Sequence, residues 1–344
     1  NAFTGVDAEW VGQREVVGAS AEGASAEAGA APARAAAAGR PHHVRAFLVV
    51  PVERRPRDAE GLADNDLELD RENPDALFGG LWYGGGLGPL RSRVDVEAYV
   101  LALREEDSTE RTTADRRLVT TGLRLRREAP PAGWDFELET ALQAGTSRAT
   151  TRLDDEADLD HLAWFVHGEL GYTLAASWRP RLALQYDRAS GDDEPTDHRN
   201  GRFDTLFGAR RFEFGPTGIH GALARSNIHS PALRLEIRPA PTLQGALAYR
   251  PVWLAAARDA WTTTGLHDPT GRSGSFVGHQ LEGSFAWSHP WGGDVSASGG
   301  GGGDAAFEIG FARLWSGAFP RRTAGADGRL VDPSYLYAQV SVSR

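Results

Sequence analysis

Cysteine and methionine are both absent from this chain of 344 residues. Without cysteine the protein can form neither disulfides nor thiolate metal sites, and the redox compartment is left open. The sequence also lacks any run of about 18 apolar residues, so no transmembrane helix is expected. The longest apolar run, AFLVVPV at residues 46–52, has the length of a strand. The chain opens NAFTGVDAEW, without the basic and apolar regions of a signal peptide. We therefore expect that such a peptide has been removed, or that the chain is the tail of a longer gene product.

An excess of basic residues is missing as well. The formal net charge is −10 and the isoelectric point is about 5.5, so no nucleic acid partner is expected. The ten histidines show no HExxH spacing, and no GxSxG motif appears. GLWYGGGLG at residues 80–88 is rich in glycine but leads into no helix, which argues against a phosphate site. We therefore expect no enzyme, no cofactor and no metal.

Alternation of apolar and polar residues recurs along the whole chain, whereas helical periodicity is nearly absent. WDFELETALQA (134–144) places Trp134, Leu138 and Leu142 on one face and acidic residues on the other. PRLALQYD (180–187) and ALRLEIRP (232–239) alternate in the same way. About thirteen strands are predicted. Three of them are the segments above, a fourth is HLAWFVHGELGYTL (161–174), and a fifth is a glycine-rich piece at 79–86. The other eight lie near 2–10, 43–54, 92–104, 116–127, 243–254, 278–288, 305–315 and 333–343.

The connections between these strands alternate between short and long. The long polar ones lie near 55–78, 105–115, 147–160, 189–230, 255–277 and 316–332. Tight turns at one end and long loops at the other are typical of an outer-membrane barrel, whose strands are apolar outside and polar inside. Closing the sheet into a barrel also gives every backbone N–H and C=O group within the lipid a hydrogen-bond partner. We therefore predict an all-β fold, an antiparallel transmembrane β-barrel. The alternative is a β-sandwich, in which the apolar aromatic residues would form a dry core instead of an interfacial girdle.

Two stretches interrupt the strand pattern. Residues 12–42 include the alanine- and glycine-rich segment ASAEGASAEAGAAPARAAAAGR, and residues 296–304 are a glycine linker. Both lie where the alternation predicts periplasmic turns, so we interpret the first as a low-complexity periplasmic insertion and the second as a flexible turn. Neither indicates a domain boundary, and residues 1–344 are predicted to form a single outer-membrane β-barrel domain.

Two blocks resemble the alginate-export outer-membrane family. They are SGDDEPTDHRNGRFDTLFGARRFEFGPTGIHGALARSNIHSP (190–231) and YRPVWLAAARDAWTTTGLHDPTGRSGSFVGHQLE (249–282). The resemblance implies an 18-stranded barrel that passes an anionic polyuronate through an arginine-rich pore. It also implies that about five strands precede the thirteen predicted here. Such barrels usually end in an aromatic residue, whereas this chain ends in Arg344.

The segment DHRNGRFDTLFGARRFEFGPTG (197–218) lies in the longest predicted external connection. Its four arginines would lie at the mouth of the barrel, where guanidinium groups can bind carboxylates in a bidentate way: Arg199, Arg202, Arg210 and Arg211. The alternative is a folded plug, in which these arginines pair with Asp204 and Glu213 of the same stretch.

Alternation also predicts charged residues that face the lumen and form the pore. These are Arg124, Arg126, Arg181, Arg234, Arg238, Arg250, Glu236 and Asp187. Rings of mixed charge can tune selectivity, but they can equally form ion pairs that stiffen the wall. Anion selectivity requires the arginines to cluster at one height.

From this pattern and the resemblance we predict passive export of an anionic polysaccharide across the outer membrane of a Gram-negative cell. The expected partners are outer-membrane lipid and lipopolysaccharide, an acidic polysaccharide such as alginate, and periplasmic export or assembly proteins. Two alternatives stay open. One is a general, sugar- or anion-selective porin for uptake, and the other is a barrel enzyme or adhesin that acts at the cell surface.

Overall fold

The structure is a computed structural model that describes residues 2–11, 42–52, 76–88, 94–107, 112–207, 214–215, 220–291, 303–324 and 332–343. Within these residues the chain forms a series of β-strands and one short helix. The elements are β1 (Ala2–Val11), β2 (His43–Val52), β3 (Ala76–Leu87), β4 (Val94–Glu105), β5 (Arg117–Arg127), β6 (Gly133–Ser147), β7 (Leu159–Thr173), β8 (Arg181–Ala189), β9 (Arg199–Asn200), β10 (Ile228–Ala240), β11 (Leu243–Trp253), β12 (Phe276–Trp291), β13 (Gly303–Ser316), α2 (Ala318–Thr323) and β14 (Ser334–Ser343).

The strands are hydrogen-bonded in chain order, from β1 to β8 and from β10 to β14, with β8 next to β10. Pairing is antiparallel along β1–β5 and along β7, β8 and β10–β14. Strand β9 lies off this path and pairs in parallel with β7. The predicted all-β antiparallel fold is confirmed, and each of the thirteen predicted strands corresponds to a strand of this order. Within it, β1 and β14 each have one strand neighbour, so the order is consistent with part of a barrel.

Two short elements differ from the prediction. Strand β9 has two residues and helix α2 has six, which is too short for either to show a periodicity in the sequence. The connection predicted at 189–230 is shorter in the structure, because β8 extends to Ala189 and β10 begins at Ile228. No helix in the described part of the chain is long and apolar enough to cross a membrane.

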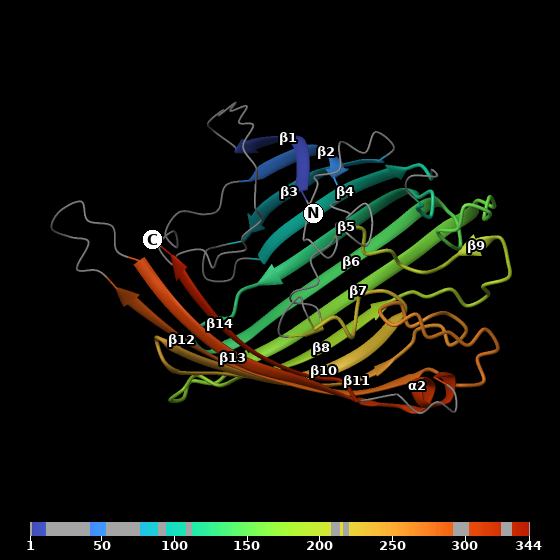
Figure 1. The fold of residues 1–344 in the computed structure, drawn as a ribbon. Helices are drawn as coiled ribbons and strands as arrows, with labels where there is room; N and C mark the ends of the chain where they lie inside the picture. The colour runs from blue at the N-terminus through green and yellow to red at the C-terminus, as the bar shows by residue number, and fades with distance from the viewer. Residues whose placement is uncertain are drawn as a thin grey trace, which may run out of the picture. The chain divides into compact units, whose positions relative to one another are not determined.

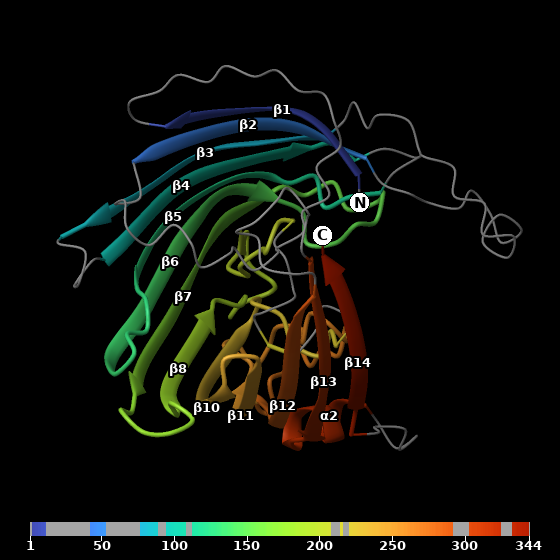
Figure 2. The ribbon, with the colours of Figure 1, turned by 90° about the vertical axis from the view of Figure 1, so that its left-hand side faces the viewer.

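The chain divides into two compact units. The first comprises Asn1–Arg127, Glu139–Leu162 and His198–Asn200, and the second comprises Glu128–Leu138, Ala163–Asp197 and Gly201–Arg344. In the first unit β1–β5 lie side by side (Figure 2), and in the second unit β8 and β10–β14 lie side by side (Figure 1). The single-domain assignment stays a prediction. The insertion predicted at 12–42 lies outside the described residues, except for its last residue.

In both units the apolar side of the strands is exposed and the polar side is buried. In the first unit Leu162 is 67% exposed, whereas the neighbouring-strand residue Gln143 is fully buried. In the second unit Leu184 is 62% exposed, whereas Asp187 on the same strand is 1% exposed. We call these sides the apolar face and the polar face. A soluble sandwich would bury its apolar face, so the exposed leucines and tryptophans favour the barrel, whose apolar face contacts lipid.

The strands of the second unit have two different ends. At the end that we call the short-turn end, residues 174–180 connect β7 to β8, and residues 241–242 connect β10 to β11. At the opposite end, the long-loop end, residues 190–227 follow β8, residues 254–275 follow β11, and α2 follows β13 (Figure 1). Short turns and long loops thus lie at opposite ends of these strands, as predicted.

Candidate functional site

Three of the predicted pore arginines lie on neighbouring strands of the second unit's polar face: Arg181 on β8, Arg234 on β10 and Arg250 on β11. Arg181 is opposite Glu236, two residues from Arg234, and Arg234 is opposite Ala248, two residues from Arg250. Each arginine is therefore two residues closer to the long-loop end than the one before it. From the ordinary spacing between strands and the rise per residue, the Cα atoms of neighbouring arginines in this series are about 8 Å apart. The arginines form a diagonal stripe instead of a single cross-strand row.

Arg181 is the centre of an ion-pair network on this face. It pairs with Asp135 of β6 and Glu169 of β7, and its Nη1 lies 3.5 Å from Oε2 of Glu236. Nε of Arg234 lies 2.8 Å from the other oxygen of Glu236. Two guanidinium groups thus share three carboxylates, so this part of the face is not a free anion site.

Asp187 is the centre of a second network, closer to the long-loop end. Its carboxylate lies 2.7 Å from Nδ1 of His167. One of its oxygens is 3.7 Å from Nη2 of Arg225, and the other is 3.7 Å from Nη1 of Arg250. The sequence predicted Asp187 and Arg250 as pore residues but missed Arg225, because that arginine lies in the connection after β8 and not in a strand.

Arg250 is buried beneath the same connection. Only 3% of the residue is exposed, and its Cζ lies 5.1 Å from the centre of the Phe214 ring. Its Nη2 donates to Oε1 of Gln185 at 3.4 Å, and Nε2 of Gln280 donates to the carbonyl oxygen of Phe214 at 2.7 Å. The β8–β10 connection therefore reaches the polar face at Phe214, and Arg250 would have to lose this cover before it could bind a solute.

The start of the same connection is held by a different carboxylate. Nε of Arg202 donates to both oxygens of Asp259, at 3.0 and 2.9 Å, and Asp259 belongs to the β11–β12 connection. Burial would lower the pKa of Arg202, but the hydrogen bond and charge of Asp259 outweigh it and raise that pKa. Phe203 is buried against the ring of Phe165, at 5.0 Å between ring centres. These contacts favour the plug alternative, with a carboxylate from outside the stretch as partner.

Of the other three arginines in the segment at 197–218, the structure describes one, Arg199. Arg199 opens β9 in the first unit, where it is exposed and lies opposite Asp160 of β7. Its neighbour Asn200 donates to Oγ of Ser147 at 3.0 Å. Arg210 and Arg211 lie outside the described residues, so their predicted role at the mouth stays a prediction.

In the first unit the predicted pore arginines also face acidic partners. Nη1 of Arg124 lies 3.2 Å from Oε2 of Glu97, the residue opposite it on β4. Arg126 is opposite Asp95 in the same register. Hydrogen-bonded side chains continue on this face, where the Tyr99 hydroxyl donates to Glu139 at 3.0 Å. The β4–β5 hairpin thus pairs its own charges across the two strands.

The first unit has a further charge cluster that the sequence did not predict, in the long polar connections at residues 105–115 and 147–160. Nη1 of Arg148 lies 3.0 Å from Asp107, and its Nη2 lies 3.1 Å from Asp115. Arg116 pairs with the buried Glu105 at 2.6 Å. Acidic residues and arginines are closely spaced in the sequence of these connections, but this spacing predicts ion pairs only weakly. Only the fold shows that the two connections meet.

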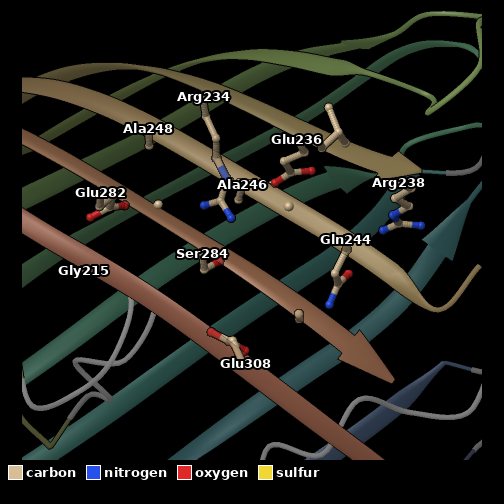
Figure 3. A pocket seen from close by; sticks show the side chains of 14 residues that line it. Gly215, Arg234, Glu236, Arg238, Gln244, Ala246, Ala248, Glu282, Ser284 and Glu308 are labelled. Atoms are coloured by element: carbon tan, nitrogen blue, oxygen red, sulfur yellow. Dashed lines mark ion pairs between the residues drawn. The ribbon is translucent and has the colours of Figure 1, made fainter. Parts of the chain in front are cut away.

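A pocket of about 330 Å³ lies on the second unit's polar face and extends to the short-turn end (Figure 3). Its charged lining consists of Arg234, Glu236, Arg238, Glu282 and Glu308. Within the described residues Arg238 forms no ion pair, and its side chain is exposed. Among Arg181, Arg234, Arg238 and Arg250, Arg238 is therefore the one positioned to meet a solute without first losing a carboxylate partner among the described residues.

No group of three histidine or acidic side chains within the described residues is arranged to hold a metal ion. In the second unit the candidate site is a polar face with networks of paired charges, the exposed guanidinium of Arg238 and a connection packed against the face. Such a face can guide an ionic solute by exchanging ion-pair partners.

The chain matches the family model of alginate export proteins over residues 4–329. This match covers nearly the whole chain, so the chain belongs to the alginate export family, an outer-membrane family that exports polysaccharide. Family membership agrees with the predicted absence of enzymatic activity. No curated protein matches the chain.

Proposed function

We propose that this member of the alginate export family is a channel of the Gram-negative outer membrane that passively exports an alginate-like polyuronate. The observation that supports this best is the inversion of the two faces: leucine and tryptophan side chains are exposed, whereas charged side chains such as Asp187 and Arg250 are buried. That arrangement suits strands with lipid on one side and a polar lumen on the other. Its partners would then be membrane lipid, including lipopolysaccharide, the polymer itself, and periplasmic export or assembly proteins.

The resident carboxylates suggest how a polyanion passes without being trapped. A uronate that binds Arg181 or Arg234 has to replace Glu236, so one ion pair is exchanged for another. The net gain in free energy is small, because both pairs have similar chemistry. Conduction needs sites that are favourable enough to enter and weak enough to leave. A diagonal of arginines about 8 Å apart offers successive sites of this kind.

The described parts of the β8–β10 connection, at Phe203 and Phe214, would act as the constriction. Phe203 and Phe214 are buried, and Phe214 covers Arg250, so the connection narrows access to the Asp187 network from the long-loop end. We propose that the polymer displaces it during passage. The energy for export would come from synthesis of the polymer or from partner proteins.

Single-channel recording of the full-length protein in planar bilayers tests this function. We expect an open channel whose current is blocked by polyuronate from the side of the short turns and is insensitive to a neutral polysaccharide of equal length. Arg238→Gln is expected to weaken the block about two- to fivefold, the loss expected for one exposed charge interaction. Arg272→Gln is the matched control, because Arg272 is an exposed loop arginine that does not line the pocket.

Other outcomes identify the alternatives. Block by neutral sugars, unaffected by Arg238→Gln, would indicate a porin for uptake. A barrel without conductance that hydrolyses or binds a surface polymer would indicate an enzyme or adhesin. Either result contradicts the export channel.

A further inference from the structure

Two arginines of the second unit's strands lie on the apolar face, where a charge is least expected. Within the described strands of this unit, Arg181, Arg234, Arg238 and Arg250 alternate onto the polar face, whereas Arg188 on β8 and Arg313 on β13 have the opposite parity and are exposed. A cation on the lipid face of a barrel is strongly destabilising at the membrane midplane and nearly neutral at the interface. Both arginines should therefore lie at an interface.

Each arginine extends over a tryptophan that lies closer to the long-loop end. Cζ of Arg188 is 5.4 Å from the ring centre of Trp164, and Val166, two residues from Trp164 on β7, is the residue opposite Arg188. Cζ of Arg313 is 5.4 Å from the ring centre of Trp315, two residues further along β13. The two side chains thus direct their charges to the same end of the strands, as long cationic side chains do near a membrane surface.

A histidine and several rings lie beside Arg188. His229 is directly opposite Arg188 on β10, so their Cβ atoms are about 5 Å apart. The His229 ring lies 5.4 Å from the ring of Tyr186 and 5.6 Å from the ring of Trp253. A guanidinium and an imidazole are thus held side by side within an aromatic surface. No carboxylate among the described residues forms an ion pair with Arg188.

The short-turn end of the same face is different. It also carries paired rings, Trp134 with Tyr172 at 4.8 Å and Trp287 with His289 at 5.7 Å. Within the described residues of the second unit, however, no arginine lies on the apolar face of a strand at that end. Both ends of this face therefore have aromatic residues, but on the described strands of the second unit arginine lies on the apolar face only toward the long-loop end.

We propose that Arg188 and His229 bind a phosphate group of a phosphorylated glycolipid in the outer leaflet. This inference rests on the proposed outer-membrane location. A guanidinium binds phosphate through two parallel hydrogen bonds, and an imidazole N–H supplies a third. The surrounding rings give an apolar support for the lipid's sugar and acyl groups. An unpaired cation next to hydrocarbon is stabilised by such an anion, and the leaflet that contains it marks the long-loop end as the external one.

Native mass spectrometry of the full-length protein, released from nanodiscs, tests the site with three probes: bisphosphorylated lipid A, fully dephosphorylated lipid A, and inorganic phosphate. We expect retention of the bisphosphorylated lipid alone. Arg188→Gln is expected to weaken this retention about tenfold or more, as loss of one charge-assisted pair implies, and Arg188→Lys should restore part of it. Arg272→Gln should bind like the unchanged protein.

Equal retention of the dephosphorylated lipid, or unchanged retention by Arg188→Gln, would overturn the proposal. Unfolding of each variant in phosphatidylcholine vesicles confirms that a loss of binding is not a loss of fold. Channel recording in bilayers without glycolipid separates this proposal from the export function. A polyuronate-blocked current with no lipid selectivity refutes only the lipid site, whereas lipid selectivity without a current refutes only the channel.

Discussion

The Asp187 network offers a quantitative test, because one carboxylate there faces three cationic or ionisable side chains. Replacing Asp187 by asparagine keeps the size of the side chain and one oxygen that can accept a hydrogen bond from His167. In the unchanged protein, Nδ1 of His167 lies 2.7 Å from Oδ1 of Asp187. The replacement removes the negative charge opposite Arg225 and Arg250, each at 3.7 Å. The side chain of Arg250 is almost fully buried, and that of Arg225 is mostly buried. The substitution therefore removes one carboxylate charge from beside two guanidinium groups.

Breaking a buried ion pair by removing one partner typically costs about 3–5 kcal/mol. The two arginine distances exceed hydrogen-bond length, and Arg225 and Arg250 also stack on Phe165 and Phe214, so part of their stabilisation is retained. We therefore expect Asp187→Asn to lower the free energy of unfolding by about 2–3 kcal/mol. The same change makes this part of the polar face more positive, so block by polyuronate should become stronger.

Urea unfolding in lipid vesicles measures the first effect, and single-channel block measures the second. Asp193→Asn is the matched control, because it removes the same charge from an exposed loop position. A variant with unchanged stability would refute the ion-pair account of Asp187. A destabilised variant with weaker polyuronate block would refute the idea that resident carboxylates compete with the polymer.

Two further predictions concern a loop and a strand. Burial, and then the charge of Asp259, raises the pKa of Asp192. The folded loop therefore binds a proton at Asp192 more tightly than the unfolded chain does. The loop loses this stabilisation as the pH rises from the ordinary pKa of aspartate to the raised pKa of Asp192. Limited proteolysis within residues 190–227 should therefore slow on acidification through this window, and Asp192→Asn should abolish the pH dependence; a rate that falls with rising pH contradicts the assignment. Gly278 has φ +154°, and an added Cβ would lie 2.1 Å from the carbonyl oxygen of Trp315, so Gly278→Ala should lower the unfolding free energy by about 1–3 kcal/mol or more. Gly168→Ala on β7 meets nothing within 4 Å and should stay within about 1 kcal/mol of the unchanged protein; equal effects would contradict the steric argument.

The strands and their faces were predictable from the sequence because each depends on local alternation. In β8, for example, the pattern RLALQYDRA itself assigns Leu184 to one face and Asp187 to the other, and the structure exposes the first and buries the second. The predicted bounds differ most at β10, where Ile228–Pro231 precede the predicted start. Ser230 and Pro231 weaken the alternation there, although Ser230 is buried and its hydroxyl donates to the carbonyl oxygen of Pro251.

The ion-pair partners could not be predicted, because they depend on register and on loops that approach from far along the chain. Arg181 meets Asp135, which is 46 residues away, through pairing of three successive strands. Arg202 meets Asp259 at a separation of 57 residues, through two different connections. Composition predicts that charges of both signs face the lumen, but a shift of one strand by two residues would give Arg181 other neighbours.

The meaning of arginine in this chain depends on its position and not on its abundance. All 37 basic residues are arginine, and lysine does not occur, so the choice of a guanidinium at any one site is not by itself a sign of carboxylate recognition. What distinguishes the arginines is their surroundings. Arg181 is bound by resident acids, Arg238 is exposed in a pocket and forms no ion pair with the residues that the structure describes, and Arg188 lies on the opposite face over a tryptophan. Replacing arginine by lysine keeps the charge but removes the planar guanidinium, so two such substitutions test these roles. Arg188→Lys should keep part of its phosphate binding, whereas Arg181→Lys should lose the bidentate pairing with Asp135 and destabilise the protein.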